Sequence, residues 1–128
     1  MTLDSSALIA ILFSESGYLD LLDRVLTAEN VRVSAPTLVE TSLVLAGRRR
    51  SPAADEVVAL MRELGVTVVP FGEPEWHAAV AAFLRFGRGR HAAALNFGDC
   101  LSYAAASVAG DSLLFVGDDF AATDIVPA

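Results

Sequence analysis

The sequence predicts an α/β fold in which a mostly parallel central sheet of four to five strands is flanked by helices. Short apolar segments alternate along the chain with longer segments of helical periodicity, which is the pattern of parallel strands joined by helices. Hydrophobic residues make up 54% of the 128 residues and charged residues 20%, enough for a layered hydrophobic core. We therefore expect one domain spanning residues 1–128.

The first half of the chain contains two expected strands, at Met1 to Asp4 and at Val31 to Ser34. The first strand runs directly into a helical stretch, so Asp4 stands where it can cap a helix. A second helix is expected from Tyr18 to Leu26, where apolar residues recur at helical spacing. A third begins at Pro36, because proline is tolerated at the first position of a helix.

The second half alternates in the same way. A helix is expected from Ser51-Pro52 to Gly65, and a strand follows at Val66 to Val69. The next helix begins at Glu73, and we expect its larger apolar residues to face the core: Trp76, Val80, Phe83 and Leu84. A strand is expected at Ser112 to Val116, and Asp124 to Val126 is expected to add a short edge strand.

Composition excludes several classes of protein. No apolar run approaches the ~20 residues that cross a bilayer, and the N-terminus lacks the features of a signal peptide. We therefore expect a cytoplasmic protein. The single Cys100 cannot form an internal disulfide, and with His77 and His91 it shows no zinc-ligand spacing. The chain has no lysine, which argues against P-loop proteins, receiver domains and haloacid-dehalogenase-type phosphatases.

The formal net charge is -7, yet the nine basic residues are all arginine. Guanidinium groups bind phosphate through paired hydrogen bonds, so local basic patches are compatible with a nucleic-acid partner. One cluster, Arg48 to Arg50, ends an expected helix, where cations are favoured in any case. The other contains Arg85, Arg88 and Arg90 and belongs to a glycine-rich loop, which makes it the better candidate for phosphate contact.

Acidic residues stand at the ends of four separate segments. Asp4 and the Asp118-Asp119 pair follow expected strands, Asp99 lies in the first turn of an alanine-rich helix, and Glu40 lies near the start of another. The working residues of a parallel sheet gather beyond the carboxyl ends of its strands, so these side chains can converge on one edge. Two of the four also have ordinary explanations. Asp99 at a helix start is favoured by about 0.3–1 kcal/mol without any function, and Glu40 is either on an exposed face or buried with a partner.

Converging carboxylates predict a bound cation, because they repel one another without one. Ligands that are all oxygen select Mg²⁺, with Mn²⁺ as a substitute. Such ions activate water and hold a phosphodiester for attack. The chemistry that these residues predict is therefore phosphodiester hydrolysis.

The order of these motifs along the whole chain resembles the PIN-domain ribonucleases, and most closely the VapC toxins of bacterial toxin-antitoxin modules. The motifs are Asp4-Ser5-Ser6-Ala7-Leu8, Glu40, Asn96-Phe97-Gly98-Asp99-Cys100 with Ser102-Tyr103-Ala104, and Gly117-Asp118-Asp119-Phe120 with Thr123-Asp124-Ile125. The resemblance implies a PIN-like three-layer sandwich and a magnesium-dependent endoribonuclease. It also implies a cognate VapB-type antitoxin that inhibits the enzyme, an RNA substrate, and a homodimer that enters a larger toxin-antitoxin assembly.

Carried over residue by residue, the resemblance assigns Asp4, Glu40 and Asp99 to the family's acidic positions, as catalytic residues and metal ligands. The fourth acid departs from the family pattern, because glycine occupies one of its positions. Asp119 matches the remaining position, and Asp118 is a neighbour that could replace it. Ser6 resembles the small hydroxyl that orients the first acid.

Asn96 either supports the metal ligands indirectly or forms a turn. The two N-terminal helices expose apolar residues that suggest a groove for the antitoxin. A different class of function also fits the sequence, namely a PIN-like module without catalysis that acts through its antitoxin complex or through nucleic-acid binding. The complete set of four acids argues against this alternative.

Overall fold

The computed structural model describes residues 1–49 and 53–128. Within these residues the chain forms four strands, listed in chain order as β1 (Thr2–Leu3), β2 (Arg32–Ser34), β3 (Thr67–Val69) and β4 (Leu113–Leu114). The same residues contain six helices: α1 (Ser5–Leu12), α2 (Tyr18–Thr27), α3 (Ala35–Arg49), α4 (Ala53–Glu63), α5 (Glu73–Phe86) and α6 (Phe97–Ala109). The expected helix start at Ser51-Pro52, and with it Arg50, lies outside the described residues.

The four strands form one parallel sheet in the order β3-β2-β1-β4. β1 lies in the middle, where Thr2 is in register with Arg32 on one side and with Leu113 on the other. The expected edge strand at Asp124 to Val126 is reduced to a single parallel bridge between Leu113 and Pro127. The predicted α/β fold with a mostly parallel sheet is therefore confirmed.

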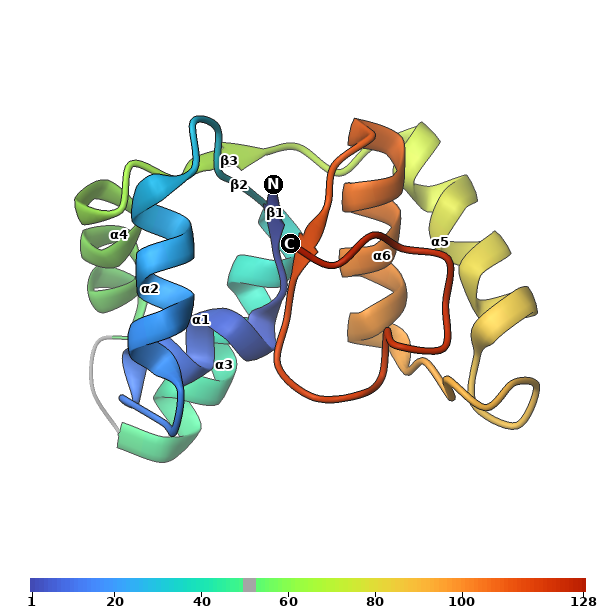
Figure 1. Cartoon of the computed structure of the whole chain (residues 1–128), viewed down its shortest axis with the longest axis horizontal. Helices are drawn as coiled ribbons and strands as arrows, with labels where there is room; N and C mark the ends of the chain where they lie inside the picture. The colour runs from blue at the N-terminus through green and yellow to red at the C-terminus, as the bar shows by residue number, and fades with distance from the viewer. Residues whose placement is uncertain (50–52) are drawn as a thin grey trace.

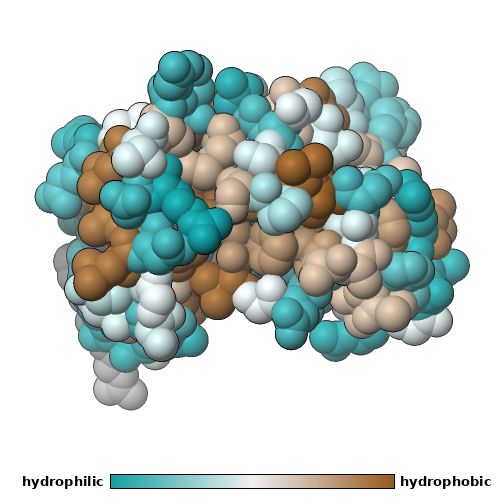
Figure 2. Space-filling model, viewed as in Figure 1, coloured by the Kyte–Doolittle hydropathy of each residue, from teal (hydrophilic) through white to brown (hydrophobic). Residues whose placement is uncertain are grey.

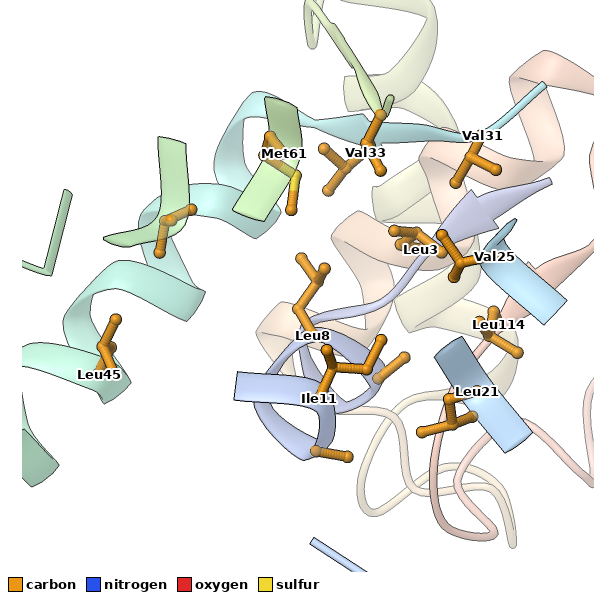
Figure 3. Close-up of a cluster of buried hydrophobic side chains, with 14 residues drawn as sticks. Leu3, Leu8, Ile11, Leu21, Val25, Val31, Val33, Leu45, Met61 and Leu114 are labelled. Carbon is orange, nitrogen blue, oxygen red and sulfur yellow. The ribbon is translucent and has the colours of Figure 1, made fainter. Parts of the chain in front are cut away.

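One face of the sheet is covered by the N-terminal helices. Buried side chains from α1, α2, α3, α4 and three strands form a continuous apolar cluster there (Figure 3), which includes Leu3, Leu8, Val25, Val33, Leu45, Met61 and Leu114. Residues on a parallel sheet need cover on both faces, because neither face is polar enough to meet water. These helices provide that cover on the first face.

The opposite face is covered by α6, and α5 packs on the outside of α6 (Figure 1). A second cluster of buried residues lies here: Ala82, Phe86, Ala93, Leu95, Cys100, Ala106, Leu113 and Phe120. Alanines at three successive positions of α6, Ala104 to Ala106, are almost fully buried. Small side chains let the helix lie close to the sheet, which explains why this part of the chain is rich in alanine. The result is the three-layer arrangement that the family resemblance implied.

The prediction for the core face of α5 is wrong. Trp76 is 57% exposed and Leu84 58%, and Val80 and Phe83 are also exposed. The face that packs inward instead carries Ala82 and Phe86. Apolar residues surround α5 on most sides, so their spacing does not single out one buried stripe.

Two apolar side chains of other helices are also on the surface. Val108 in α6 is 44% exposed and Leu26 in α2 is 61% exposed. On the face in Figure 2, hydrophobic residues form several separate patches among hydrophilic ones. Among the described residues, no helix is long and apolar enough to cross a membrane.

Candidate active site

The four acidic positions lie beyond the carboxyl ends of the parallel strands. Asp4 directly follows β1, Glu40 lies in the second turn of the helix that follows β2, and Asp119 lies in the segment after β4. Asp99 is in the first turn of α6. In Figure 1 the segment after β4 curves around the lower edge of the sheet, next to the start of α6. The fold therefore brings four distant parts of the sequence to one edge.

Asp4 is buried and held by the first turn of α1. Its Oδ2 accepts a hydrogen bond from the Ser6 backbone N–H at 3.0 Å and another from the Ser6 hydroxyl at 2.5 Å. The same Ser6 hydroxyl oxygen accepts a hydrogen bond from the Val116 N–H at 2.9 Å. Ser6 thus joins the residue after β1 to the segment after β4. The structure places this hydroxyl where the family resemblance expected it, beside the first acid.

Asp99 is held by a reciprocal pair of hydrogen bonds at the start of α6. The Asn96 side-chain oxygen accepts from the Asp99 N–H at 3.0 Å, and Asp99 Oδ2 accepts from the Asn96 N–H at 2.7 Å. This capping box satisfies two N–H groups that the helix itself cannot pair. Asn96 therefore caps α6 instead of forming a turn, and its hydrogen bonds orient Asp99.

The electrostatics of Asp99 show that the four acids influence one another. Burial, the largest cause, raises the pKa of Asp99 from 3.8 to about 6, although the hydrogen bond from the Asn96 backbone lowers it. Repulsion from Asp119, Asp4 and Glu40 adds to the rise in pKa, in that order. Because three other carboxylates oppose the ionisation of Asp99, a cation bound between these groups would be favourable.

Glu40 is half-buried, between the exposed and the buried positions that the sequence left open. Burial is the main cause that raises its pKa, a hydrogen bond from the Ser5 side chain lowers it, and repulsion from Asp4 raises it further. Ser5 is itself buried at the start of α1. No sequence signal singles out Ser5, because a serine at a helix start has an ordinary capping role.

Of the two adjacent acids Asp118 and Asp119, it is Asp119 that interacts electrostatically with Asp99. Asp119 raises the pKa of Asp99 by repulsion, and Asp118 is not among the groups that do so. Gly117 precedes the pair with a φ of +102°, a conformation that strongly favours glycine. Phe120 follows the pair and is buried, with its ring 4.9 Å from that of Phe115. The turn and this buried ring hold the acidic pair in place.

The segment after Asp119 is joined to α5 and α6 by side-chain contacts. Asp124 accepts a hydrogen bond from the Tyr103 hydroxyl at 2.6 Å and pairs with the Arg85 guanidinium at 2.5 Å. Burial, followed by the Asp124 hydrogen bond, raises the pKa of Tyr103 to about 12. These contacts join α5 and α6 to the C-terminal segment. Arg85, which was expected from the sequence to contact RNA, is therefore already paired within the protein.

Among the other arginines of the two clusters, Arg48 and Arg49 form ion pairs within the protein, whereas Arg88 and Arg90 are exposed. Arg48 pairs with Glu15, and Arg49 pairs with Glu56, while both guanidinium groups lie over the Phe13 ring. The interpretation of this cluster as a helix end is therefore supported for the described residues. In the loop before α6, Arg88 and Arg90 are exposed, and Arg90 lies 5.6 Å from the centre of the Phe83 ring.

An apolar groove that the sequence analysis missed adjoins the acids. It has a volume of about 700 Å³ and is lined by residues of α3, the β3-α5 connection and the start of α6, including Val39, Glu40, Leu43, Phe71, Phe97 and Gly98. Phe97 is 80% exposed. Apolar residues at helical spacing are usually interpreted as core, so sequence alone gives no signal for such a groove. On the two N-terminal helices, where a groove was expected, the large exposed apolar side chains are Leu19 and Leu26 of α2.

The donor atoms of the site fit a hard divalent cation. All are carboxylate oxygens, and they repel one another without a positive charge between them. The capping hydrogen bonds of Asp4 and Asp99 use Oδ2 of each, so neither cap commits Oδ1. Among the described residues no group of three or more acidic, histidine or cysteine side chains is already gathered around one point.

Comparison with known proteins agrees with this geometry. The PIN domain family model matches residues 1–126. "VapC ribonuclease Mb2004c" of Mycobacterium bovis is 40% identical over 126 residues, which cover 98% of this chain and 91% of that protein. "Ribonuclease VapC" of Mycolicibacterium smegmatis is 39% identical over 126 residues, covering 98% of this chain and 97% of that protein.

Two solved structures have the same fold. The crystal structure of VapC20 of Mycobacterium tuberculosis, described as a sarcin-ricin loop cleaving toxin, gives a TM-score of 0.80 at 20% identity and covers 99% of this chain and 97% of that one. A toxin-antitoxin complex from Klebsiella pneumoniae gives 0.72 at 18% identity, with 99% and 95% covered. The chain therefore belongs to the PIN-domain family, and its relatives within that family are VapC ribonucleases.

Proposed function

We propose that this chain is the toxin of a type II toxin-antitoxin module and an endoribonuclease that hydrolyses RNA phosphodiester bonds at the carboxylate cluster. The observation that carries the proposal is the convergence of Asp4, Glu40, Asp99 and Asp119 on one edge of the sheet, where burial raises the pKa of Asp99 and repulsion from the other three acids raises it further. The names of the relatives at about 40% identity support the same activity. The proposed substrate is cellular RNA, so the cytoplasm is the expected compartment.

The activity is expected to depend on a divalent metal ion, and the all-oxygen donor set favours Mg²⁺, with Mn²⁺ as a substitute. Asp4, Glu40, Asp99 and Asp119 are the residues proposed to hold it. When bound, such an ion supplies a Lewis acid that activates water and neutralises charge on the phosphate. Ser6 would keep Asp4 oriented, and Asn96 would do the same for Asp99, through the hydrogen bonds described above.

Substrate contact is proposed for the exposed arginines near α6. Arg88 and Arg90 stand in the loop that leads to the Asp99 helix, and both are exposed. Arg85 is a weaker candidate, because its guanidinium is paired with Asp124 and lies over the Phe86 ring. A positive loop beside a negative site would hold the RNA backbone while the acids bind metal, and each phosphate contact makes binding more sensitive to salt.

Two partners follow from the proposed role. The first is a cognate VapB-type antitoxin that inhibits the enzyme, as the likeness to VapC proteins implies. The second is another copy of the chain, because the apolar groove and the exposed residues of α5 form a surface that a homodimer would remove from water. Light scattering on the purified protein measures the oligomeric state directly.

The test of the proposed function is cleavage of total cellular RNA by the purified protein. We expect discrete products with Mg²⁺ or Mn²⁺, none with chelator, and none from Asp99→Asn. Asp23→Asn makes the same chemical change at an exposed position of α2 and should cleave as the wild type does. Equal cleavage by wild type and folded Asp99→Asn would refute catalysis by these acids. The module without catalysis would then be the better account of the chain.

A further inference from the structure

Gly98 lies in the first turn of α6, and the Glu40 carboxylate packs directly against it. A Cβ atom built at Gly98 would lie 2.7 Å from each carboxylate oxygen of Glu40 and 2.9 Å from its Cδ. Real Cβ atoms essentially never approach other heavy atoms to within 3.0 Å, so something would have to shift. Glu40 therefore occupies the space that any side chain at position 98 would fill.

The backbone gives no other reason for glycine at this position. Five glycines of the described chain have a positive φ, and Gly98 is not one of them. It is instead inside a helix, where glycine is less favourable than alanine by about 1 kcal/mol. Gly47 in α3 is also helical, but a Cβ there would meet no atom within 4 Å. The distinguishing feature of Gly98 is thus its contact with Glu40.

We propose that Gly98 is a positioning residue whose missing side chain lets the Glu40 carboxylate lie against the start of α6, next to Asp99. The Ser5 side chain of α1 interacts with the Glu40 carboxylate, which occupies the space that a side chain at Gly98 would take. This inference rests on the proposed function, because the position of Glu40 has a consequence only if Glu40 helps to bind the metal.

A side chain at position 98 would move Glu40 without unfolding the protein. The atoms that it would meet are the far end of a flexible side chain, and both residues line the open apolar groove described above. The carboxylate therefore has room to rotate away from α6. In doing so it would leave the neighbourhood of Asp99, and the metal site would lose one of its four acids.

The experiment compares Mn²⁺ binding by wild type, Gly98→Ala and the matched control Gly47→Ala, measured by calorimetry on the apoprotein. Changes in residues that support metal ligands usually weaken affinity by about 10-fold to 100-fold, and we expect a loss in that range for Gly98→Ala. Gly47→Ala should bind Mn²⁺ as the wild type does. A crystal structure of Gly98→Ala should show the Glu40 carboxylate displaced from α6.

A second pair of variants separates positioning from a general structural role. Glu40→Asp shortens the side chain by one methylene and should weaken Mn²⁺ binding in the wild-type background. With Gly98→Ala already present, the shorter acid no longer overlaps the added methyl group, so the two losses should be clearly less than additive. Additive losses would indicate unrelated effects and would overturn the inference.

Failure of this inference and failure of the proposed function give different results. Unchanged Mn²⁺ affinity in Gly98→Ala, or an undisplaced Glu40 carboxylate, overturns the positioning role even if every variant cleaves RNA. Weaker Mn²⁺ binding in Gly98→Ala, with no RNA cleavage by any protein including the wild type, supports the positioning role and refutes the nuclease. If the wild type itself binds no Mn²⁺, both the metal site and the role of Gly98 in it are refuted.

Discussion

Replacing Asp99 with asparagine should stabilise the metal-free protein while abolishing metal binding. The wild-type carboxyl group is half-buried and is repelled by Asp119, Asp4 and Glu40, which is why its pKa rises to about 6. Asparagine has a similar shape, and its side-chain oxygen can still accept the hydrogen bond from the Asn96 N–H. The variant therefore removes a charge that the folded state opposes and keeps the cap of α6.

The size of the effect follows from the shift in pKa. A rise from 3.8 to about 6 would correspond to roughly 3 kcal/mol if it acted at full strength. Solvent screening of a half-buried group reduces this to about 1–2 kcal/mol. Loss of the favourable interaction between a negative charge and the helix start takes away about 0.3–1 kcal/mol. We expect Asp99→Asn to raise the free energy of unfolding by about 1 kcal/mol at neutral pH without metal.

The sign of the pH dependence is opposite to that of a salt-bridged carboxylate. Because the folded-state pKa of Asp99 is raised, the folded protein holds the proton more tightly than the unfolded chain does. The wild type therefore loses stability as the pH rises from about 4 to about 6. The advantage of Asp99→Asn should be largest above about pH 6 and should shrink toward zero near pH 4.

Urea denaturation with chelator present, at about pH 5 and about pH 7.5, measures this advantage. Asp23→Asn serves as the control and should show no such pH-dependent gain. Added Mg²⁺ should then raise the stability of the wild type but not that of Asp99→Asn, because only a folded site binds the ion. The reasoning is refuted if metal-free Asp99→Asn is less stable than the wild type at both pH values by the same amount.

Three further predictions concern neighbouring residues. Asp119→Asn should abolish RNA cleavage, whereas Asp118→Asn should retain most of it. If parallel cleavage assays show the reverse, Asp118 and not Asp119 is the fourth acid. Ser6→Ala should cost about 1–2 kcal/mol in urea denaturation and lower the cleavage rate, because it leaves a buried carboxylate and a backbone N–H without this hydroxyl; unchanged stability would contradict the link between the two strand ends. Trp76→Ser should change stability by less than about 0.5 kcal/mol, while Phe86→Ala should cost about 3–4 kcal/mol, and equal losses would contradict the assignment of the inner face of α5.

Local sequence signals were sufficient for most of the fold. Strand and helix positions follow from short-range patterns, such as the apolar residues at helical spacing from Tyr18 to Leu26, where α2 forms. A parallel sheet then follows from the alternation of strands and helices. The acids could be expected at one edge for the same reason, because the carboxyl ends of parallel strands coincide.

Sequence patterns were insufficient wherever apolar residues occur on more than one side of a helix. In α5 the large side chains such as Trp76 and Phe83 are exposed, and the small Ala82 faces α6. Which side becomes the inner one depends on how closely the neighbouring helix approaches, and that approach is a property of the packed layers. The groove beside Glu40 likewise depends on how closely the packed helices approach one another.

The chemistry of the site was thus determined by the sequence, because the identity and order of the acids can be recognised without coordinates. The tertiary structure alone decided which atoms are close together in space. In the structure Asp119 contributes to the raised pKa of Asp99, Asp124 forms an ion pair with Arg85, and Gly98 leaves space for Glu40. Each of these contacts joins residues from separate segments, and their separation depends on the packing of whole helices and strands. Local propensity acts over a few residues, so it cannot specify such distances.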